Sequence, residues 1–170
     1  MRARKALRLS PIVALIAFML ACVSAACSPP RSFDPSRSLG YLNASAAEPA
    51  LAAAKRDAIA ANKRILINAG GEWCRWCHVL ERFLHETPDI DAQWRASFVV
   101  LKFAVGENGE GNSVLNTLPA ASGYPHFWVL AADGTLIASV ETGALEHGND
   151  DYNPRAVRQF QKNYGPPAGR

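Results

Sequence analysis

Apolar and polar positions alternate along most of this chain with the periods of helices and strands, which predicts a folded domain over residues 48–165. Residues 48–63 are rich in alanine, with Leu51 and Ile59 set between charged side chains, as in an amphipathic helix. The apolar run at 64–68 is typical of a buried strand. The further elements that we expect are a helix at 74–85, a short helix at 89–96, a strand at 98–105, a mobile loop at 106–112, a short helix at 113–121, strands at 126–130 and 135–140, and a helix at 153–164.

Two local signals support the end of this series. Asp133 and Gly134 lie between two β-prone runs and predict a hairpin. Asn153 and Pro154 suit the N-cap and the first position of a helix. The order helix, strand, helix, strand, helix, strand, strand, helix predicts an α/β fold. Its central mixed sheet of about four strands would combine a parallel β-α-β unit with an antiparallel hairpin, flanked by helices.

The first 26 residues have the pattern of a secretory signal peptide rather than of a folded element. Four basic residues precede the apolar run 12–20, which is shorter than the roughly 20 residues that span a bilayer. Small residues follow this run. We therefore expect residues 1–26 to be removed and the mature protein to lie outside the cytoplasm. An uncleaved anchor helix is the alternative.

Two cysteines near the end of this segment indicate a lipid anchor. Cys22 and Cys27 each follow small or apolar residues in the manner of a bacterial lipobox, where a cysteine becomes lipidated. The pattern fits either cysteine, and cleavage without lipid attachment stays open. We expect a periplasmic, lipid-anchored protein in which residues 27–47, rich in Pro, Ser, Ala and Arg, form a flexible tether and residues 166–170 a short tail.

The charge of the chain excludes one class of partner. The formal net charge is +3, and loss of residues 1–26 removes four cations and no acidic residue, which leaves −1. Nucleic-acid binding depends on lysine and arginine side chains that neutralise phosphates. We therefore expect no nucleic-acid partner.

The candidate chemistry lies at 71–78, directly after the apolar run at 64–68. Cys74 and Cys77 are three residues apart, so they can form a disulfide within one helical turn. Where a strand leads into such a pair, the first sulfur lies at a helix N-terminus, whose partial positive charge stabilises a thiolate. We expect Cys74 to be the more exposed sulfur and the nucleophile, and Cys77 to be the resolving thiol.

These residues, together with three later segments, resemble thioredoxin over roughly residues 50–164. The run from Ile65 to His78 matches the strand that leads into Glu-Trp-Cys-x-x-Cys. Lys102 falls where thioredoxins carry a lysine on the next strand, and Gly123-Tyr124-Pro125 resembles the segment whose proline is cis; Gly143-Ala144-Leu145 also has a counterpart. The Cys-x-Trp-Cys-His form is similar to that of secreted or lipid-anchored bacterial thioredoxin-like proteins.

The resemblance implies a thiol:disulfide oxidoreductase that needs no cofactor beyond its own dithiol. Its partners would be protein thiols and disulfides, with a membrane electron donor or acceptor. The Tyr124–Pro125 bond would be cis, close to Cys74, and would help to dock an incoming chain.

The sequence departs from the thioredoxin pattern around the cysteines. Thioredoxins keep a buried aspartate six residues before the first cysteine, and Asn68 stands there instead, which cannot accept a proton from Cys77. Glu72, His78 and Lys102 are the alternative bases, acting through water. Arg75 adds a cation beside Cys74 and should help to lower the pKa of its thiol.

Aromatic side chains flank the two cysteines. Trp73 fits ordinary core packing, whereas Trp76 should be partly exposed and offer an apolar docking surface together with Tyr124.

Other functions for Cys74 and Cys77 remain open from the sequence. The pair could be a structural disulfide, although so short a loop stabilises little. Together with His78 it matches the c-type haem attachment pattern, and one such pair is half a zinc site. The domain could also be a binding or assembly module without redox turnover. The sequence leaves the direction of electron flow open.

Overall fold

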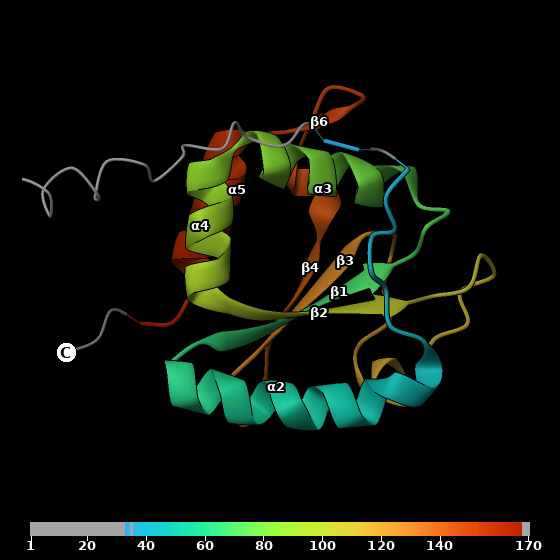
Figure 1. Cartoon of the computed structure of the whole chain (residues 1–170), viewed down its shortest axis with the longest axis vertical. Coiled ribbons are helices and arrows are strands. Elements are labelled where there is room, and N and C mark those ends of the chain that lie inside the picture. Colours follow the sequence, from blue (N-terminus) through green and yellow to red (C-terminus); the bar gives the residue numbers. More distant parts are fainter. Residues whose placement is uncertain (1–32, 35, 168–170) are drawn as a thin grey trace, which may run out of the picture. The chain divides into compact units, whose positions relative to one another are not determined.

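A four-stranded sheet lies at the centre of the computed structural model, which describes residues 33–34 and 36–167 (Figure 1). The helices are α2 (Ala47–Ala61), α3 (Arg75–Glu86), α4 (Pro88–Ser97) and α5 (Pro154–Tyr164), and the strands of the sheet are β1 (Arg64–Gly70), β2 (Phe98–Ala104), β3 (His126–Leu130) and β4 (Leu136–Glu141). Shorter elements are the 3-10 turns η2 (Ala44–Ala46), η3 (Leu115–Thr117) and η4 (Thr142–Leu145) and the strands β5 (Glu146–His147) and β6 (Asp151–Tyr152).

The sheet has the expected mixed topology. Its strand order is β2-β1-β3-β4, with β1 and β2 parallel and the other pairs antiparallel. The helices α3 and α4 connect the parallel pair, as such a pair requires. The predicted α/β fold, with a parallel β-α-β unit and an antiparallel hairpin, is therefore confirmed.

Alternation along β1 sends side chains to two separate cores. Ile65, Ile67 and Ala69 pack against α2 on one face of the sheet. Leu66 faces the other way, into a core with α3, α4 and α5, which lie together on that side in Figure 1. The next residue on this second face is Asn68, and its position there brings it under α3.

The folded region begins earlier than the composition indicated. Contacts group the chain from Phe33 onward into one compact unit. Leu42 forms a parallel bridge with Phe103 on the outer edge of β2, and in Figure 1 this cyan segment passes that edge before α2. The tether predicted for residues 27–47 is thus wrong for its second half, because backbone pairing and the buried Leu39 hold that part against the domain. The predictions for residues 1–26, including Cys22 and Cys27, lie outside the described residues.

Capping and turn signals were reliable, and short irregular elements were not. The Asn153 side chain accepts hydrogen bonds at the start of α5, and Gly134 turns the hairpin between β3 and β4 with φ of 96°. The helix expected at 113–121 is reduced to the three-residue turn η3. The β5–β6 pair was not anticipated, because two-residue strands leave no periodic pattern.

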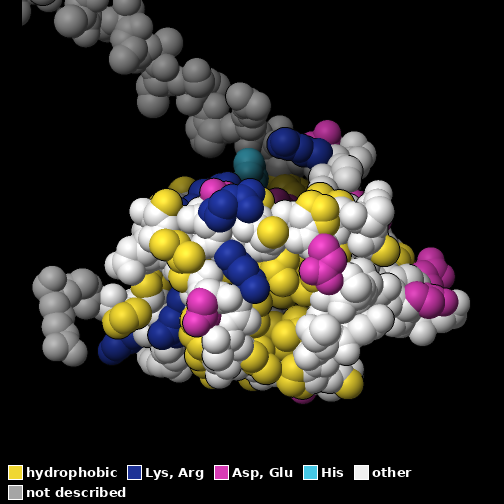
Figure 2. All heavy atoms as spheres, turned by 90° about the horizontal axis from the view of Figure 1, so that it is seen from below, with side chains coloured by type: hydrophobic (Ala, Val, Ile, Leu, Met, Phe, Trp, Pro, Cys, Tyr) yellow, Lys and Arg dark blue, Asp and Glu magenta, His cyan; other side chains and the backbone are white. Residues whose placement is uncertain are grey.

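The surface on the α2 side mixes charges of both signs. Figure 2 shows basic and acidic side chains interspersed with apolar ones on this face. None of the helices within the described residues is long and apolar enough to cross a membrane.

Candidate active site

Cys74 lies at the N-terminus of α3, where the turn after β1 places it. The Cys74 amide donates to the Gly71 carbonyl at 3.1 Å, which closes this turn. Cys74 is the N-cap of α3, and its sulfur accepts a hydrogen bond from the Cys77 amide at 3.2 Å. The two cysteines form a disulfide with their Cα atoms 5.2 Å apart. A helix N-terminus that donates to this sulfur would also stabilise its thiolate after reduction.

The two glycines before the motif leave room for the site. A Cβ atom on Gly70 would lie 2.4 Å from the Cys77 sulfur and 2.8 Å from the Tyr41 hydroxyl oxygen. A Cβ atom on Gly71 would lie 2.6 Å from the indole nitrogen of Trp73. A larger residue at either position would collide with the site.

Cys74 is not exposed, contrary to our expectation. Cys74 and Cys77 are each only 3% exposed. The side chain of Leu39, itself 6% exposed, packs with both cysteines, and Tyr41 and Tyr124 lie against the same cluster. The cover comes from the N-terminal segment that the sequence suggested to be a flexible tether, so its composition gave no sign of it.

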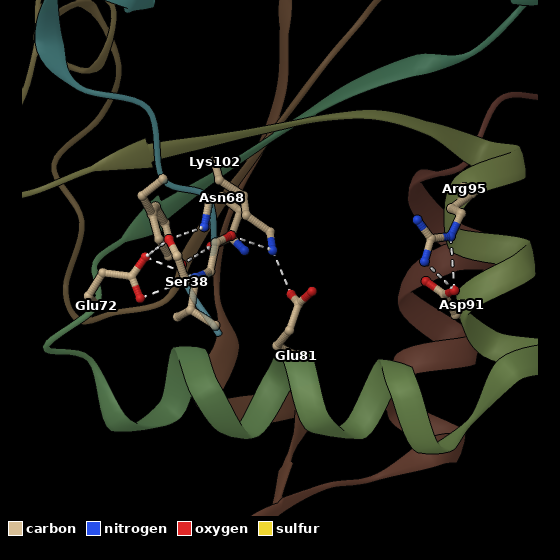
Figure 3. A network of polar contacts seen from close by, with 10 residues as sticks. Ser38, Asn68, Glu72, Glu81, Asp91, Arg95 and Lys102 are labelled. Atoms are coloured by element: carbon tan, nitrogen blue, oxygen red, sulfur yellow. Dashed lines mark hydrogen bonds and ion pairs between the residues drawn. The ribbon is translucent and has the colours of Figure 1, made fainter. Parts of the chain in front are cut away.

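Glu72 holds that N-terminal segment in place. Its carboxylate accepts hydrogen bonds from the Ser38 hydroxyl at 2.8 Å and from the Leu39 amide at 2.9 Å (Figure 3). The bond from Leu39 lowers the pKa of Glu72 below its usual value. The ring nitrogen Nε2 of His78 lies 2.8 Å from the Glu72 carbonyl oxygen. Two of the three proposed bases are therefore engaged in contacts on this outer side of the site.

A second polar group lies between α3 and the sheet. The Lys102 ammonium donates to the Glu81 carboxylate at 2.5 Å and to the Leu39 carbonyl at 3.1 Å. Lys102 is also the register partner of Asn68, whose amide oxygen accepts a hydrogen bond from Tyr41 at 3.4 Å. Figure 3 shows Glu81 reaching from α3 toward Lys102.

Glu81 and Tyr41 were not among the predicted site residues. Glu81 follows Cys77 by four residues, so on a helix both project from one face toward the sheet. This spacing was a usable signal. Tyr41 had none, because it lies in a segment without period. Burial raises the pKa of Tyr41, which keeps its hydroxyl protonated and able to donate.

Of the two tryptophans beside the cysteines, Trp73 differs from the prediction and Trp76 agrees with it. Trp73, expected in the core, is 44% exposed; its indole donates to the Val105 carbonyl at 2.8 Å and its ring meets Tyr124 edge-on at 5.8 Å. Trp76 is partly exposed, as expected, and packs edge-on against Tyr152. The guanidinium of Arg75 lies 5.9 Å from the centre of the Trp76 ring, so it stacks on this ring.

The Tyr124–Pro125 peptide bond is cis, as the resemblance implied. Pro125 itself is fully buried, and its carbonyl accepts a hydrogen bond from the Thr142 hydroxyl at 2.7 Å. The docking of an incoming chain on the backbone of Tyr124 and Pro125 stays a prediction, although the proline ring itself is covered. Beside it, Tyr124 borders a pocket of about 350 Å³ whose lining includes Leu115 and Trp128. The partly exposed aromatic side chains near the cysteines are thus Trp73, Trp76 and Tyr124, and Tyr124 also borders this pocket.

Comparison with known proteins supports this view of the fold. A family model described as thioredoxin-like matches residues 46–132. A crystal structure of a disulphide isomerase from Xylella fastidiosa Temecula1 is 22% identical, with a TM-score of 0.52, and the match covers 78% of this chain and 98% of that one. No curated protein matches the chain. Within the described residues, no group of three or more His, Cys, Asp or Glu side chains could hold a metal ion.

Proposed function

Since this chain belongs to the thioredoxin-like family, we propose that it is a thiol:disulfide oxidoreductase that exchanges disulfides with protein substrates through Cys74 and Cys77. The observation that carries the proposal is the hydrogen bond from the Cys77 amide to the Cys74 sulfur at the start of α3. A structural staple needs no such donor, whereas a nucleophilic thiolate is stabilised by it.

The exchange proceeds in two steps that conserve electrons and protons. The Cys74 thiolate attacks a substrate disulfide, forms a mixed disulfide and releases one substrate sulfur as a thiolate. The Cys77 thiolate then attacks the Cys74 sulfur, which restores the disulfide found here and releases the second substrate thiolate. The substrate gains the two electrons that the dithiol loses. The same steps in reverse oxidise a substrate.

Loss of the proton from Cys77 is the step for which Asn68 offers no base. We assign it to Glu81, which lies one helical turn beyond Cys77 and pairs with Lys102 on the inner side of α3. A carboxylate there can accept the proton through one water molecule, and Lys102 can hold the carboxylate in position. Glu72 is less suited, because the N-terminal segment occupies its oxygens.

We further propose that this activity operates outside the cytoplasm, on a protein held to the membrane by a lipid. The support is the signal-like pattern of residues 1–26 with Cys22 and Cys27 at its end. In that compartment a reductase requires a membrane electron donor and an oxidase an acceptor.

Insulin reduction tests the function directly. Reduced full-length protein should precipitate insulin, and Cys74→Ser should abolish this activity while Asn108→Ala, in the loop after β2, leaves it unchanged. Absence of insulin reduction by the unaltered protein would favour a binding module. A Soret band in the purified protein would favour a haem protein. The redox potential against glutathione then gives the direction: below about −230 mV for a reductase and near −120 mV for an oxidant.

A further inference from the structure

Residues 38–41, which we call the strap, cover the disulfide. Leu39 is buried against Cys74 and Cys77, and Tyr41 packs on the same cluster. Gly40, between them, has φ of 73°, a left-handed conformation that turns the backbone and brings both side chains inward. The strap is thus shaped to the site rather than passing over it.

Leu39 is bound on three sides. Its amide donates to Glu72, its carbonyl accepts from Lys102, and its side chain is buried in one cluster with Cys74 and Cys77. Backbone hydrogen bonds combined with one apolar side chain in a recess are also how an extended peptide is recognised. The strap therefore satisfies the groups that an incoming protein segment would use.

Exchange cannot take place with the strap in this position. The attacking sulfur of a protein substrate must reach a cysteine that is almost completely buried. The Ser38 and Glu72 side chains, which hold the outer end of the strap, are exposed to solvent. Beyond the strap, Leu42 is fixed to β2 by two backbone hydrogen bonds of 2.8 and 2.9 Å. Displacement of residues 38–41 about this fixed point would uncover the disulfide and leave the sheet unchanged.

We propose that the strap is a removable cover that mimics substrate, and that an extended protein segment with an apolar side chain beside its cysteine takes the place of Leu39. This inference rests on the proposed oxidoreductase function for its choice of occupant. Glu72 and Lys102 then become ligands for the substrate backbone once the strap has left. The strap makes the dithiol selective for its substrate. Displacing the strap breaks its contacts with the site, and only a substrate segment that forms equivalent contacts offsets that loss of free energy.

The test is the rate at which an uncharged phosphine, tris(hydroxypropyl)phosphine, reduces the disulfide of the oxidised full-length protein. Leu39→Ala should accelerate reduction by about tenfold or more, because the cover loses the packing that keeps it closed. Leu136→Ala is the matched control, since it truncates an exposed leucine on β4. An unchanged rate in Leu39→Ala, with its circular dichroism spectrum intact, would overturn the proposal.

A second variant tests the cover without touching its apolar packing. Glu72→Ala removes the acceptor of the Ser38 and Leu39 hydrogen bonds and should speed reduction several-fold, whereas Glu72→Gln keeps one acceptor oxygen and should have a smaller effect. Equal reduction rates for the unaltered protein, Glu72→Ala and Glu72→Gln would contradict the proposal that these hydrogen bonds hold the strap over the disulfide.

Insulin reduction separates this inference from the proposed function. If the cover mimics substrate, Leu39→Ala should also turn over insulin faster than the unaltered protein. If insulin reduction is absent while phosphine reduction still depends on Leu39, the cover stands and the oxidoreductase function fails. If insulin is reduced and neither rate responds to Leu39, the cover fails and the function stands.

Discussion

At the scale of single residues, the site depends on a glycine without a side chain at position 70 and on an amide side chain at position 68. Gly70 leaves the space in which Cys77 and Tyr41 come together, and Asn68, the register partner of Lys102, stands where thioredoxins have an acid. Both substitutions were visible in the sequence. Their effect depends on neighbours that only the fold shows. Tyr41 lies beside Gly70, and Glu81 offers the carboxylate that Asn68 lacks.

Gly70→Ala should lower the free energy of unfolding of the oxidised protein by about 1–3 kcal/mol, because the added methyl group collides with Cys77 and Tyr41. Denaturant unfolding followed by tryptophan fluorescence measures this loss. Gly123→Ala is the control, since a Cβ atom there meets nothing within 4 Å. Equal losses in the two variants would show that the space around Gly70 is not constrained.

Glu81→Gln should slow release of the mixed disulfide by about tenfold or more near neutral pH, since an amide cannot accept the proton of Cys77. The difference should vanish at alkaline pH, where the thiol ionises without help. Quenched-flow measurement of the mixed disulfide across pH follows this step. Glu86→Gln, at the end of the same helix, should match the unaltered protein at every pH. A pH-independent loss in Glu81→Gln would point to a structural role.

At the scale of elements, prediction succeeded where a local signal has a local cause. The strand before Cys74, the helix after it and the Asn153 cap all follow from residues next to one another in the chain. It failed where distant contacts decide. Leu39 is one apolar residue in a polar stretch, and only its contact with the cysteines gives it a fixed place. The prediction that Cys74 is the more exposed sulfur was wrong for the same reason.

Asn153→Ala should destabilise the domain by about 1 kcal/mol, because its side chain accepts hydrogen bonds from the Arg155 and Ala156 amides at the start of α5. Thermal unfolding measures the effect. Asn153→Asp keeps a capping oxygen and should retain most of the stability; a loss as large as that in the alanine variant would contradict the capping role.

At the scale of the whole molecule, two cores on opposite faces of one sheet support a site at the end of β1. Helix α2 stabilises the face away from the cysteines, and α3 to α5 stabilise the face that carries them. His126 follows the cis proline and is the first residue of β3, the strand that pairs with β1. It is buried, and its ring nitrogen Nε2 lies 2.8 Å from the Ser139 hydroxyl oxygen.

Stability should fall on acidification through His126. Burial lowers the pKa of His126 below the usual 6.5, while the negative charge of Glu141 raises it by a smaller amount. The folded protein therefore keeps the ring neutral at a pH where the unfolded chain takes up a proton. The contribution is present above pH 6.5 and is lost as the pH falls below it. His126→Gln should flatten the profile below pH 6.5 in denaturant titrations. An unchanged slope would place the dependence elsewhere.

The pairing of Leu42 with β2 has a consequence for solubility. β2 is the last strand at its side of the sheet, and the Leu42 backbone pairs with the Lys102 carbonyl and the Ala104 amide along that border. An uncovered border strand recruits strands from other molecules. A chain begun at residue 48 would expose this border, so it should self-associate in light scattering, whereas a chain begun at residue 42 should stay monomeric. We therefore expect the residues just before α2 to keep copies of the protein apart.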